Sequence, residues 1–124
     1  MRLVTALLFI TSVIPPMLHA QSRSSSKDAG DAVTASYYSS RYDHRRTASG
    51  ERFNNGAMTA AHRTYPFGTK LRITNVSNNR SATVRVNDRG PFVDGREISM
   101  TKRAARQLGF VHQGLAQVRV EQLH

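Results

Sequence analysis

Short segments in which apolar and polar residues alternate dominate this chain. Val84 and Val86 alternate with Arg85 and Asn87, and the C-terminal segment places apolar residues at every second position in the same way. Alternation of this kind is typical of a β-strand with one face in a core and the other in solvent. It predicts strands at residues 33–38, 58–62, 70–75, 81–86 and 115–123, with hairpin-forming residues at 77–79.

One segment follows a helical pattern instead. Residues 101–108 are preceded by Ser99 and start at Thr101, either of which is a suitable N-cap, and they end at Gly109. Short, closely spaced and mostly one-sided strands with a single short helix favour an all-β fold that closes into a small barrel. With 124 residues the chain has room for one such domain.

The N-terminal segment has the pattern of a secretory signal peptide. Arg2 supplies a positive charge, residues 3–14 are mostly apolar, and Ala20 is a small residue suited to cleavage. A membrane anchor is the alternative, but the apolar run is short for a bilayer span. We therefore expect a signal peptide at residues 1–20, a flexible leader at 21–32 and the folded domain at 33–124, exported to the periplasm or secreted.

The composition limits how the domain is stabilised and what it binds. The chain has no cysteine, so the domain depends on its core without disulfides. It carries 18 Lys and Arg against 8 Asp and Glu, a formal net charge of +10. In a cytosolic protein this excess would suggest nucleic acid. For an exported protein the expected partners are envelope polyanions or an acidic wall polymer, and charge alone does not distinguish them.

The candidate chemistry centres on the junction after the fourth predicted strand. Pro91 has no N–H for a ladder, so the strand ends near Gly90 and Asp88 lies where a rigid element meets a loop. A catalytic carboxylate and a carboxylate that only hydrogen-bonds the turn both fit this position. If the alternation continues, Arg89 points away from Asp88, and Asp88 shares the apolar side of Val86. Desolvation there would favour the protonated carboxyl that a general acid needs.

Two further side chains stand out. Glu51 follows a Ser-Gly pair in the polar, arginine-rich loop 39–55, where it is either a site residue or a solvated carboxylate. His62 ends an apolar strand, where it is either a site residue or a hydrogen-bonded spacer. Because His44, His62 and Asp88 lack the local spacing of a metal site, and no phosphate-binding glycine loop occurs, we expect neither a metal nor a cofactor.

Several short motifs occur in an order that is similar to one known family. They read ASYY at 35–38, RTASGE at 46–51, TAAH at 59–62, PFGT at 66–69, VRVNDRGPF at 84–92 and AARQLG at 104–109. From about residue 33 to residue 120 the sequence resembles the rare lipoprotein A family of endolytic peptidoglycan transglycosylases. The resemblance implies a six-stranded double-psi β-barrel, related in fold to expansins and barwin-like domains.

The resemblance also implies an activity and the residues that perform it. It implies cleavage of the bond between N-acetylmuramic acid (MurNAc) and N-acetylglucosamine (GlcNAc) without water, leaving 1,6-anhydro-MurNAc ends. By the same resemblance Asp88 is the catalytic acid, and Glu51 and His62 support it. The motif residues expected to bind substrate are Tyr38, Arg46, Ser49, Asn87 and Arg89. The arginines expected to line the groove and bind stem-peptide carboxylates are Arg41, Arg45, Arg46 and Arg52.

Three departures from the family pattern refine these expectations. The lipid-anchoring cysteine is absent, which predicts a protein without a stable membrane anchor, and we expect no C-terminal glycan-binding module after residue 124. Ser99 stands where the family commonly has Asp, and expansin-like relatives use a carboxylate in that region. This substitution weakens an expansin-type interpretation and leaves Asp88 and Glu51 unaffected.

The expected partner is the glycan strand of peptidoglycan, bound by a monomer, with division or envelope proteins as further candidates and no nucleic acid. A non-catalytic, expansin-like glycan-binding module that uses the same groove is the alternative. A third interpretation, a basic envelope protein that binds nucleic acid or anionic lipid, rests on charge alone.

Overall fold

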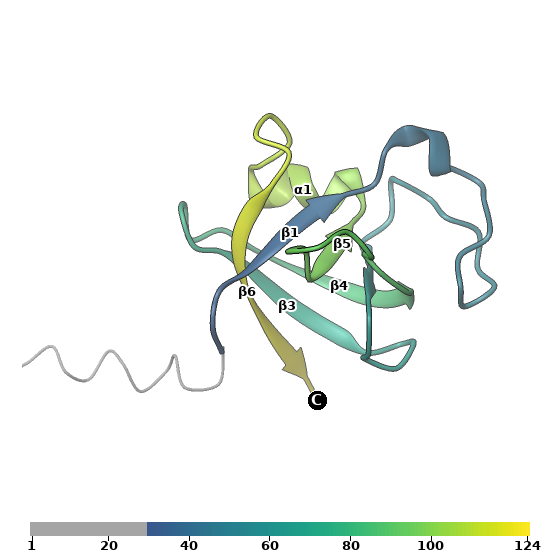
Figure 1. Cartoon of the computed structure of the whole chain (residues 1–124), viewed down its shortest axis with the longest axis horizontal. Helices are drawn as coiled ribbons and strands as arrows, with labels where there is room; N and C mark the ends of the chain where they lie inside the picture. Colours follow the sequence, from purple (N-terminus) through teal and green to yellow (C-terminus); the bar gives the residue numbers. More distant parts are fainter. Residues whose placement is uncertain (1–29) are drawn as a thin grey trace, which may run out of the picture.

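A computed structural model describes residues 30–124; the predicted signal peptide and most of the predicted leader lie outside the described residues. Within this range six strands close into a barrel in the order β1-β5-β2-β4-β3-β6, with β6 pairing back onto β1 (Figure 1). The elements are β1 (Val33–Tyr37), the 3-10 turn η2 (Ser40–Tyr42), β2 (Thr59–His62), β3 (Lys70–Asn75), β4 (Ser81–Asp88), β5 (Ile98–Met100), α1 (Lys102–Leu108) and β6 (Ala116–Leu123). The predicted all-β barrel with one short helix is confirmed.

The residues that the alternation predicts to face inward on β3 and β4 are buried in the core. Leu71 and Ile73 on β3 and Val84 and Val86 on β4 are fully buried, while the residues between them are exposed or half-buried. β1 pairs with β5 and β2 with β4 in parallel, and the other four pairings are antiparallel. Closure leaves the barrel without a free sheet edge, which suits a small domain that has no disulfide.

β5 is a strand that the alternation did not predict. Its three residues are all buried, so no polar face marks it in the sequence. Ile98 pairs with Ala35 of β1 on one side and with His62 of β2 on the other, which makes β5 an interior strand of the barrel. Ser99 lies in this strand and accepts a hydrogen bond from the Ser36 hydroxyl at 3.3 Å. The prediction that Ser99 could be the helix N-cap was therefore wrong.

The helix begins and ends where the sequence indicates. Thr101 is its N-cap, with Oγ1 accepting from the amide of Ala104 at 3.3 Å. Gly109 ends it with a φ of 79°, in the left-handed region that glycine adopts without strain. The final carbonyl, that of Leu108, accepts from the side-chain amides of Asn75 and Asn78, which fixes α1 to the β3–β4 hairpin.

A β-bulge near the end of β4 sets the direction of the residues that follow. Ala60 of β2 pairs with Val86, but Ala61 pairs with Asp88, so Asn87 has no partner in β2. Val86 and Asn87 are consequently both buried, and the alternation stops before Asp88. The bulge lies at the rim of the barrel, beside the long segment between β1 and β2 that projects to the right in Figure 1.

Candidate active site

Asp88 is the last residue of β4, and its carboxylate is held by three donors. Oδ2 accepts from the Tyr38 hydroxyl at 2.6 Å, and Oδ1 accepts from the amides of Ala48 at 2.8 Å and Arg89 at 2.9 Å. The expectation that Asp88 would face apolar surroundings beside Val86 was wrong, because the bulge at Asn87 turns the side chain toward these polar groups. The expected position at a junction between strand and loop is confirmed.

The Tyr38 hydroxyl reaches Asp88 from a small aromatic cluster. The Tyr38 ring packs against Phe53, with centroids 4.5 Å apart, and against Tyr42, with centroids 5.6 Å apart. Burial, followed by the hydrogen bond to Asp88, raises the pKa of Tyr38 far above its ordinary value. The hydroxyl therefore keeps its proton and remains able to donate to the carboxylate.

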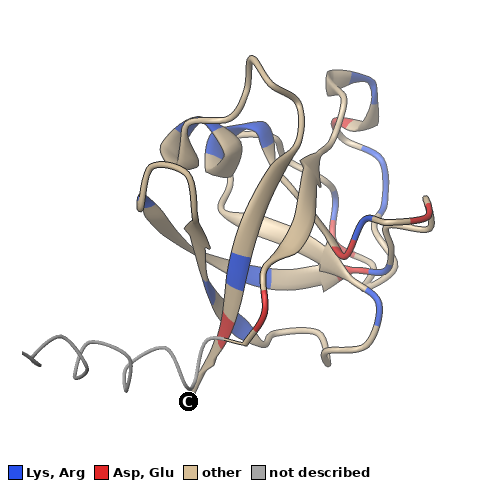
Figure 2. Ribbon diagram, turned by 60° about the vertical axis from the view of Figure 1, so that its left-hand side comes forward, with Lys and Arg blue, Asp and Glu red and all other residues tan. Residues whose placement is uncertain are grey.

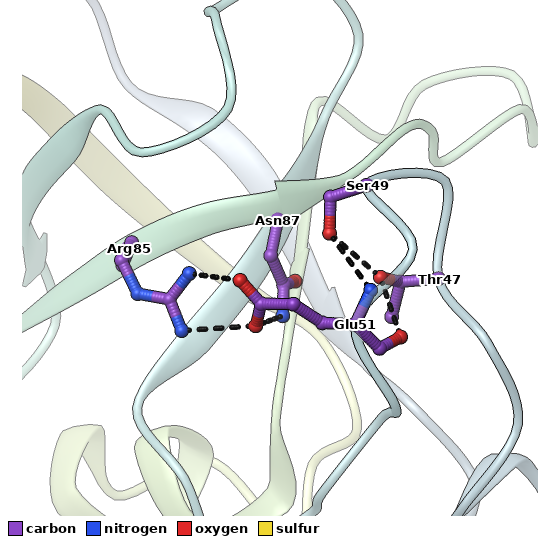
Figure 3. A network of polar contacts seen from close by, with 5 residues as sticks. All are labelled: Thr47, Ser49, Glu51, Arg85 and Asn87. Atoms are coloured by element: carbon purple, nitrogen blue, oxygen red, sulfur yellow. Dashed lines mark hydrogen bonds and ion pairs between the residues drawn. The ribbon is translucent and has the colours of Figure 1, made fainter.

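The loop that carries the Ala48 amide is closed by its own polar contacts (Figure 3). The Thr47 hydroxyl donates to the carbonyl of Glu51 at 3.0 Å and pairs with the Ser49 hydroxyl at 2.9 Å. The amide of Ser49 in turn donates to the carbonyl of Asn87 at 3.3 Å, which attaches the loop to the bulge. These contacts fix the direction in which the amide of residue 48 points.

Glu51 forms an ion pair on the outer side of this loop (Figure 3). Both its oxygens accept from the Arg85 guanidinium, at 2.6 and 3.0 Å, and Oε1 also accepts from the side-chain Nδ2 of Asn87 at 3.2 Å. The hydrogen bond from Arg85, then that from Asn87, lowers the pKa of Glu51 below its ordinary value. Glu51 is therefore ionised and paired. Arg85 is a partner that the sequence analysis did not identify, although it lies two residues before Asn87 on the same strand.

His62 holds the turn after β2. Its Nδ1 accepts from the amides of Thr64 and Tyr65, both at 3.2 Å, and its ring packs on that of Tyr65 with centroids 4.4 Å apart. Burial lowers the pKa of His62, so the neutral ring with Nδ1 as acceptor is favoured. The carbonyls of His62 and Tyr65 accept from the Arg89 guanidinium at 3.2 and 2.8 Å. The Arg89 guanidinium is thus bonded to the turn after β2 and not to the Asp88 carboxylate, although the alternation from which this was predicted ends at the bulge.

A groove of about 580 Å³ opens beside Asp88. Four of the predicted site residues line it, namely Tyr38, Arg46, Asp88 and Arg89. Four are not among its lining residues, namely Ser49, Glu51, His62 and Asn87, which instead hold the surrounding loops. Lining residues that the sequence analysis did not select include Tyr42, Phe92, Arg96 and Ser99. Of these, Ser99 lies in β5 and Arg96 two residues before it, and that strand carries no alternation by which the sequence could mark them.

The arginine-rich loop contributes part of the expected cationic wall. Arg45 and Arg46 line the groove. Arg41 lies over the Tyr42 ring, 5.3 Å from its centroid, and Arg52 donates to the carbonyl of His44 at 2.9 Å; neither is a lining residue. Two of the four arginines of this loop therefore contribute positive charge to the groove.

Phe92 is the most exposed apolar side chain of the groove. It is 80 % exposed, and its ring lies against Gly90, where a Cβ would come 3.3 Å from Cε2. Gly90 has a φ of 117°, a backbone conformation that favours glycine. An open aromatic face thus lines the same groove as the carboxylate.

Among residues 30–124 no group of three His, Asp or Glu side chains is arranged to hold a metal ion. In the same range no helix has the length and apolarity needed to cross a membrane. The chemistry available at the groove is that of a carboxyl, a tyrosine hydroxyl, backbone amides, arginines and an aromatic ring.

The closed six-stranded barrel, with a carboxylate at a strand end beside a groove, defines a double-psi β-barrel domain. The family model described as "Lytic transglycolase" matches residues 31–120. The chain belongs to this family, and its resemblance to the rare lipoprotein A proteins is confirmed.

Two curated relatives illustrate the similarity. The "Endolytic peptidoglycan transglycosylase RlpA" of Neisseria meningitidis serogroup A is 44 % identical over 119 residues, which cover 86 % of this chain and 50 % of the relative. The "Probable endolytic peptidoglycan transglycosylase RlpA" of Nostoc is 60 % identical over 79 residues, 64 % of this chain and 21 % of the relative. The chain thus matches about half, or less, of the length of these relatives.

Solved structures with the same fold have lower sequence identity. The Streptomyces papain inhibitor is 18 % identical with a TM-score of 0.60, covering 77 % of this chain and 94 % of the inhibitor. The D78N mutant of Clavibacter michiganensis expansin, in complex with cellohexaose, is 17 % identical with a TM-score of 0.59, covering 76 % of this chain and 50 % of the expansin. At these identities the similarity shows the fold alone.

Proposed function

We propose that this protein is an endolytic peptidoglycan lytic transglycosylase that cleaves the MurNAc–GlcNAc bond and leaves 1,6-anhydro-MurNAc ends. The observation that carries the proposal is the Asp88 carboxyl, held at the rim of the barrel by Tyr38 and two backbone amides and facing an open groove. Family membership and the printed names of the relatives support it. The protein acts after export, as a monomer, on the wall; division or envelope proteins are candidate partners.

In the proposed reaction Asp88 acts first as an acid. Its proton passes to the glycosidic oxygen while the bond from that oxygen to C1 of MurNAc breaks and positive charge develops on the sugar ring. A glycan lying in the groove meets this carboxyl directly, because Asp88 lines the groove. The Tyr38 hydroxyl keeps its own proton and can rotate from donor to acceptor when Asp88 is protonated.

Asp88 then acts as a base. The carboxylate takes the proton from the C6 hydroxyl of the same MurNAc, and that oxygen bonds to C1 to close the anhydro ring. The proton lost in the first step is regained in the second, so the reaction consumes no water. A second carboxylate that activates water, as in an inverting hydrolase, is not required.

Glu51 and His62 enter this proposal as positioning residues. Arg85 neutralises Glu51, so we favour a role in holding the loop 47–51, and with it the Ala48 amide, over repulsion of the Asp88 charge. His62 fixes the turn after β2 and, through its carbonyl, the Arg89 side chain. Both residues act on the site through the backbone that they hold.

Substrate contacts follow from the lining of the groove. The exposed face of Phe92 suits the apolar face of a sugar ring, and Arg45 and Arg46 offer charge to acidic groups of the strand. Ser49 and Asn87 support these contacts from behind the groove, through the loop and the bulge.

Digestion of purified sacculi by wild type and Asp88→Asn tests the proposal. Asn keeps an oxygen for the two amides but has no proton to give, so release of anhydro-muropeptides, measured by mass spectrometry, is expected to fall about 10²–10⁴-fold. Thermal melts of both proteins are the control for folding. Full activity in folded Asp88→Asn would refute the assignment, and loss of folding with activity would favour a turn-forming role.

A non-catalytic glycan-binding module is the second candidate. The groove also carries the exposed Phe92 ring and the side chains of Arg45 and Arg46, which can hold a glycan without any proton transfer. The same digestion separates the two functions, since a binding module retains sacculi without releasing anhydro ends.

A further inference from the structure

A second hollow, of about 470 Å³, adjoins the groove of Asp88. The two share the lining residues Ser36, Tyr37, Ser39 and Arg96, so they form one continuous trough. Lys102 lines only the second hollow, and Asp88 lines only the first. We call the second hollow the Arg96–Lys102 arm.

The two cations of this arm have no acidic partner. The ion pairs found among residues 30–124 involve three other arginines. Arg96 comes from the loop between β4 and β5, and Lys102 is the first residue of α1, one of the basic segments in Figure 2. Both are half-buried, and no ion pair among the described residues supplies them with a counter-charge. An anion bound between them would supply that charge.

The rest of the arm is suited to the same kind of ligand. The exposed residues Ser39 and Ser40 add hydroxyl groups to its wall. A guanidinium fork, an ammonium and hydroxyls together match a carboxylate, which accepts several hydrogen bonds at once. Among the described residues 30–124 no carboxylate lines the arm, and its two charged lining residues are both cations.

We propose that the Arg96–Lys102 arm binds a carboxylate of the glycan strand, and that it makes the protein select an acidic glycan over a neutral GlcNAc polymer. The inference rests on the proposed function, because it places the strand along the trough. Two carboxylates share this chemistry: the lactyl group of MurNAc in a strand without peptides, and the acidic groups of a stem peptide. Either source would place a carboxylate in the arm while the glycan strand lies along the groove of Asp88.

Binding of three tetrasaccharides tests the proposal by calorimetry. They are a peptide-free peptidoglycan fragment, its peptide-bearing form and neutral chitotetraose, each titrated into protein with Asp88→Asn to prevent cleavage. We expect the acidic fragments to bind about three- to tenfold more tightly than chitotetraose. The advantage should shrink as NaCl rises from about 50 to about 300 mM. Preference for the peptide-free fragment identifies the lactyl group as the source, and preference for the peptide-bearing one identifies the stem peptide.

Matched variants locate the effect. Arg96→Gln with Lys102→Gln should abolish the advantage of the acidic fragments and leave chitotetraose binding unchanged. Arg106→Gln with Arg119→Gln removes the same charge from exposed positions outside the trough and should keep the advantage. Equal binding of all three ligands, or an advantage that survives in the Arg96–Lys102 variant, would overturn the inference. Absence of anhydro ends from wild-type digests would instead refute the proposed reaction and leave this comparison of affinities valid.

Discussion

Replacing Tyr38 with Phe removes one hydroxyl from the site and leaves the aromatic packing in place. The hydroxyl donates to Asp88 at 2.6 Å, a short bond to a charged acceptor. The ring contacts with Phe53 and Tyr42 involve no hydroxyl and should persist in the variant. The substitution therefore measures the contribution of this one donor.

The expected loss of unfolding free energy is about 1.5 kcal/mol. Hydrogen bonds to charged groups contribute about 1.5–3 kcal/mol, and the lower end applies because Asp88 is only half-buried and keeps two amide donors. For a domain of this size the melting temperature should fall by about 6–12 °C.

Differential scanning calorimetry of wild type, Tyr38→Phe and Tyr42→Phe is the assay. Tyr42→Phe is the control, because it removes the same atom from a neighbouring ring. The Tyr42 hydroxyl makes no hydrogen bond with the described residues 30–124, so the melting temperature of this variant should stay within about 2 °C of wild type. Equal melting temperatures for Tyr38→Phe and Tyr42→Phe would refute the argument that Tyr38 is held in place as a donor to Asp88.

Three further predictions concern the core, the ion pair and the exposed ring. Val86→Ala should lower the unfolding free energy in urea by about 1–3 kcal/mol, whereas the more exposed Val76→Ala should have little effect; equal midpoints would contradict the burial of β4. Because Arg85 lowers the pKa of Glu51, their pair stabilises the fold above the ordinary carboxyl pKa, and this contribution is lost as the pH falls through the lowered value. The pair is largely exposed, so wild type should exceed Glu51→Gln by only about 0–1 kcal/mol at pH about 6, and the difference should disappear once the pH lies below the lowered pKa of Glu51; a difference that grows in acid would be inconsistent. Phe92→Ala should leave the melting temperature unchanged and weaken glycan binding about two- to tenfold, unlike Val93→Ala outside the groove; unaltered affinity would exclude stacking on Phe92.

Much of the barrel could be predicted because most strands bury one face. β3 and β4 alternate as one-sided strands must, and their bounds follow to within a few residues. β5 could not be found this way, since Ile98, Ser99 and Met100 are all buried and leave no polar face in the sequence. The bulge in β4 could not be predicted for a related reason. Asn87 and Asp88 are both polar, so the sequence does not show at which of them the alternation of apolar and polar residues ends.

The site was predictable in its position and less so in its contacts. A carboxylate before Gly-Pro is a local signal, and it located Asp88 at the end of a strand. The donors from Tyr38 and Ala48 and the ion pair of Glu51 with Arg85 join segments more than thirty residues apart in the chain. Such contacts depend on which strands become neighbours, and an alternating pattern contains no information about that choice.

The hydrogen bond from residue 48 to Asp88 determines which substitutions this loop can tolerate. Its donor is a main-chain amide, so replacing the side chain of Ala48, which is exposed, leaves the hydrogen bond to Asp88 in place, and among the twenty residues only proline deletes the N–H. The position in this loop that is sensitive to substitution is instead Gly50. Its φ of 93° is strained for any residue with a Cβ, even though the space around it is open. A saturation library should therefore accept Ala48→Glu more readily than the smaller change Gly50→Ala. Substitutions that disturb the Asp88 carboxylate would then be found at Gly50, a residue that does not contact it.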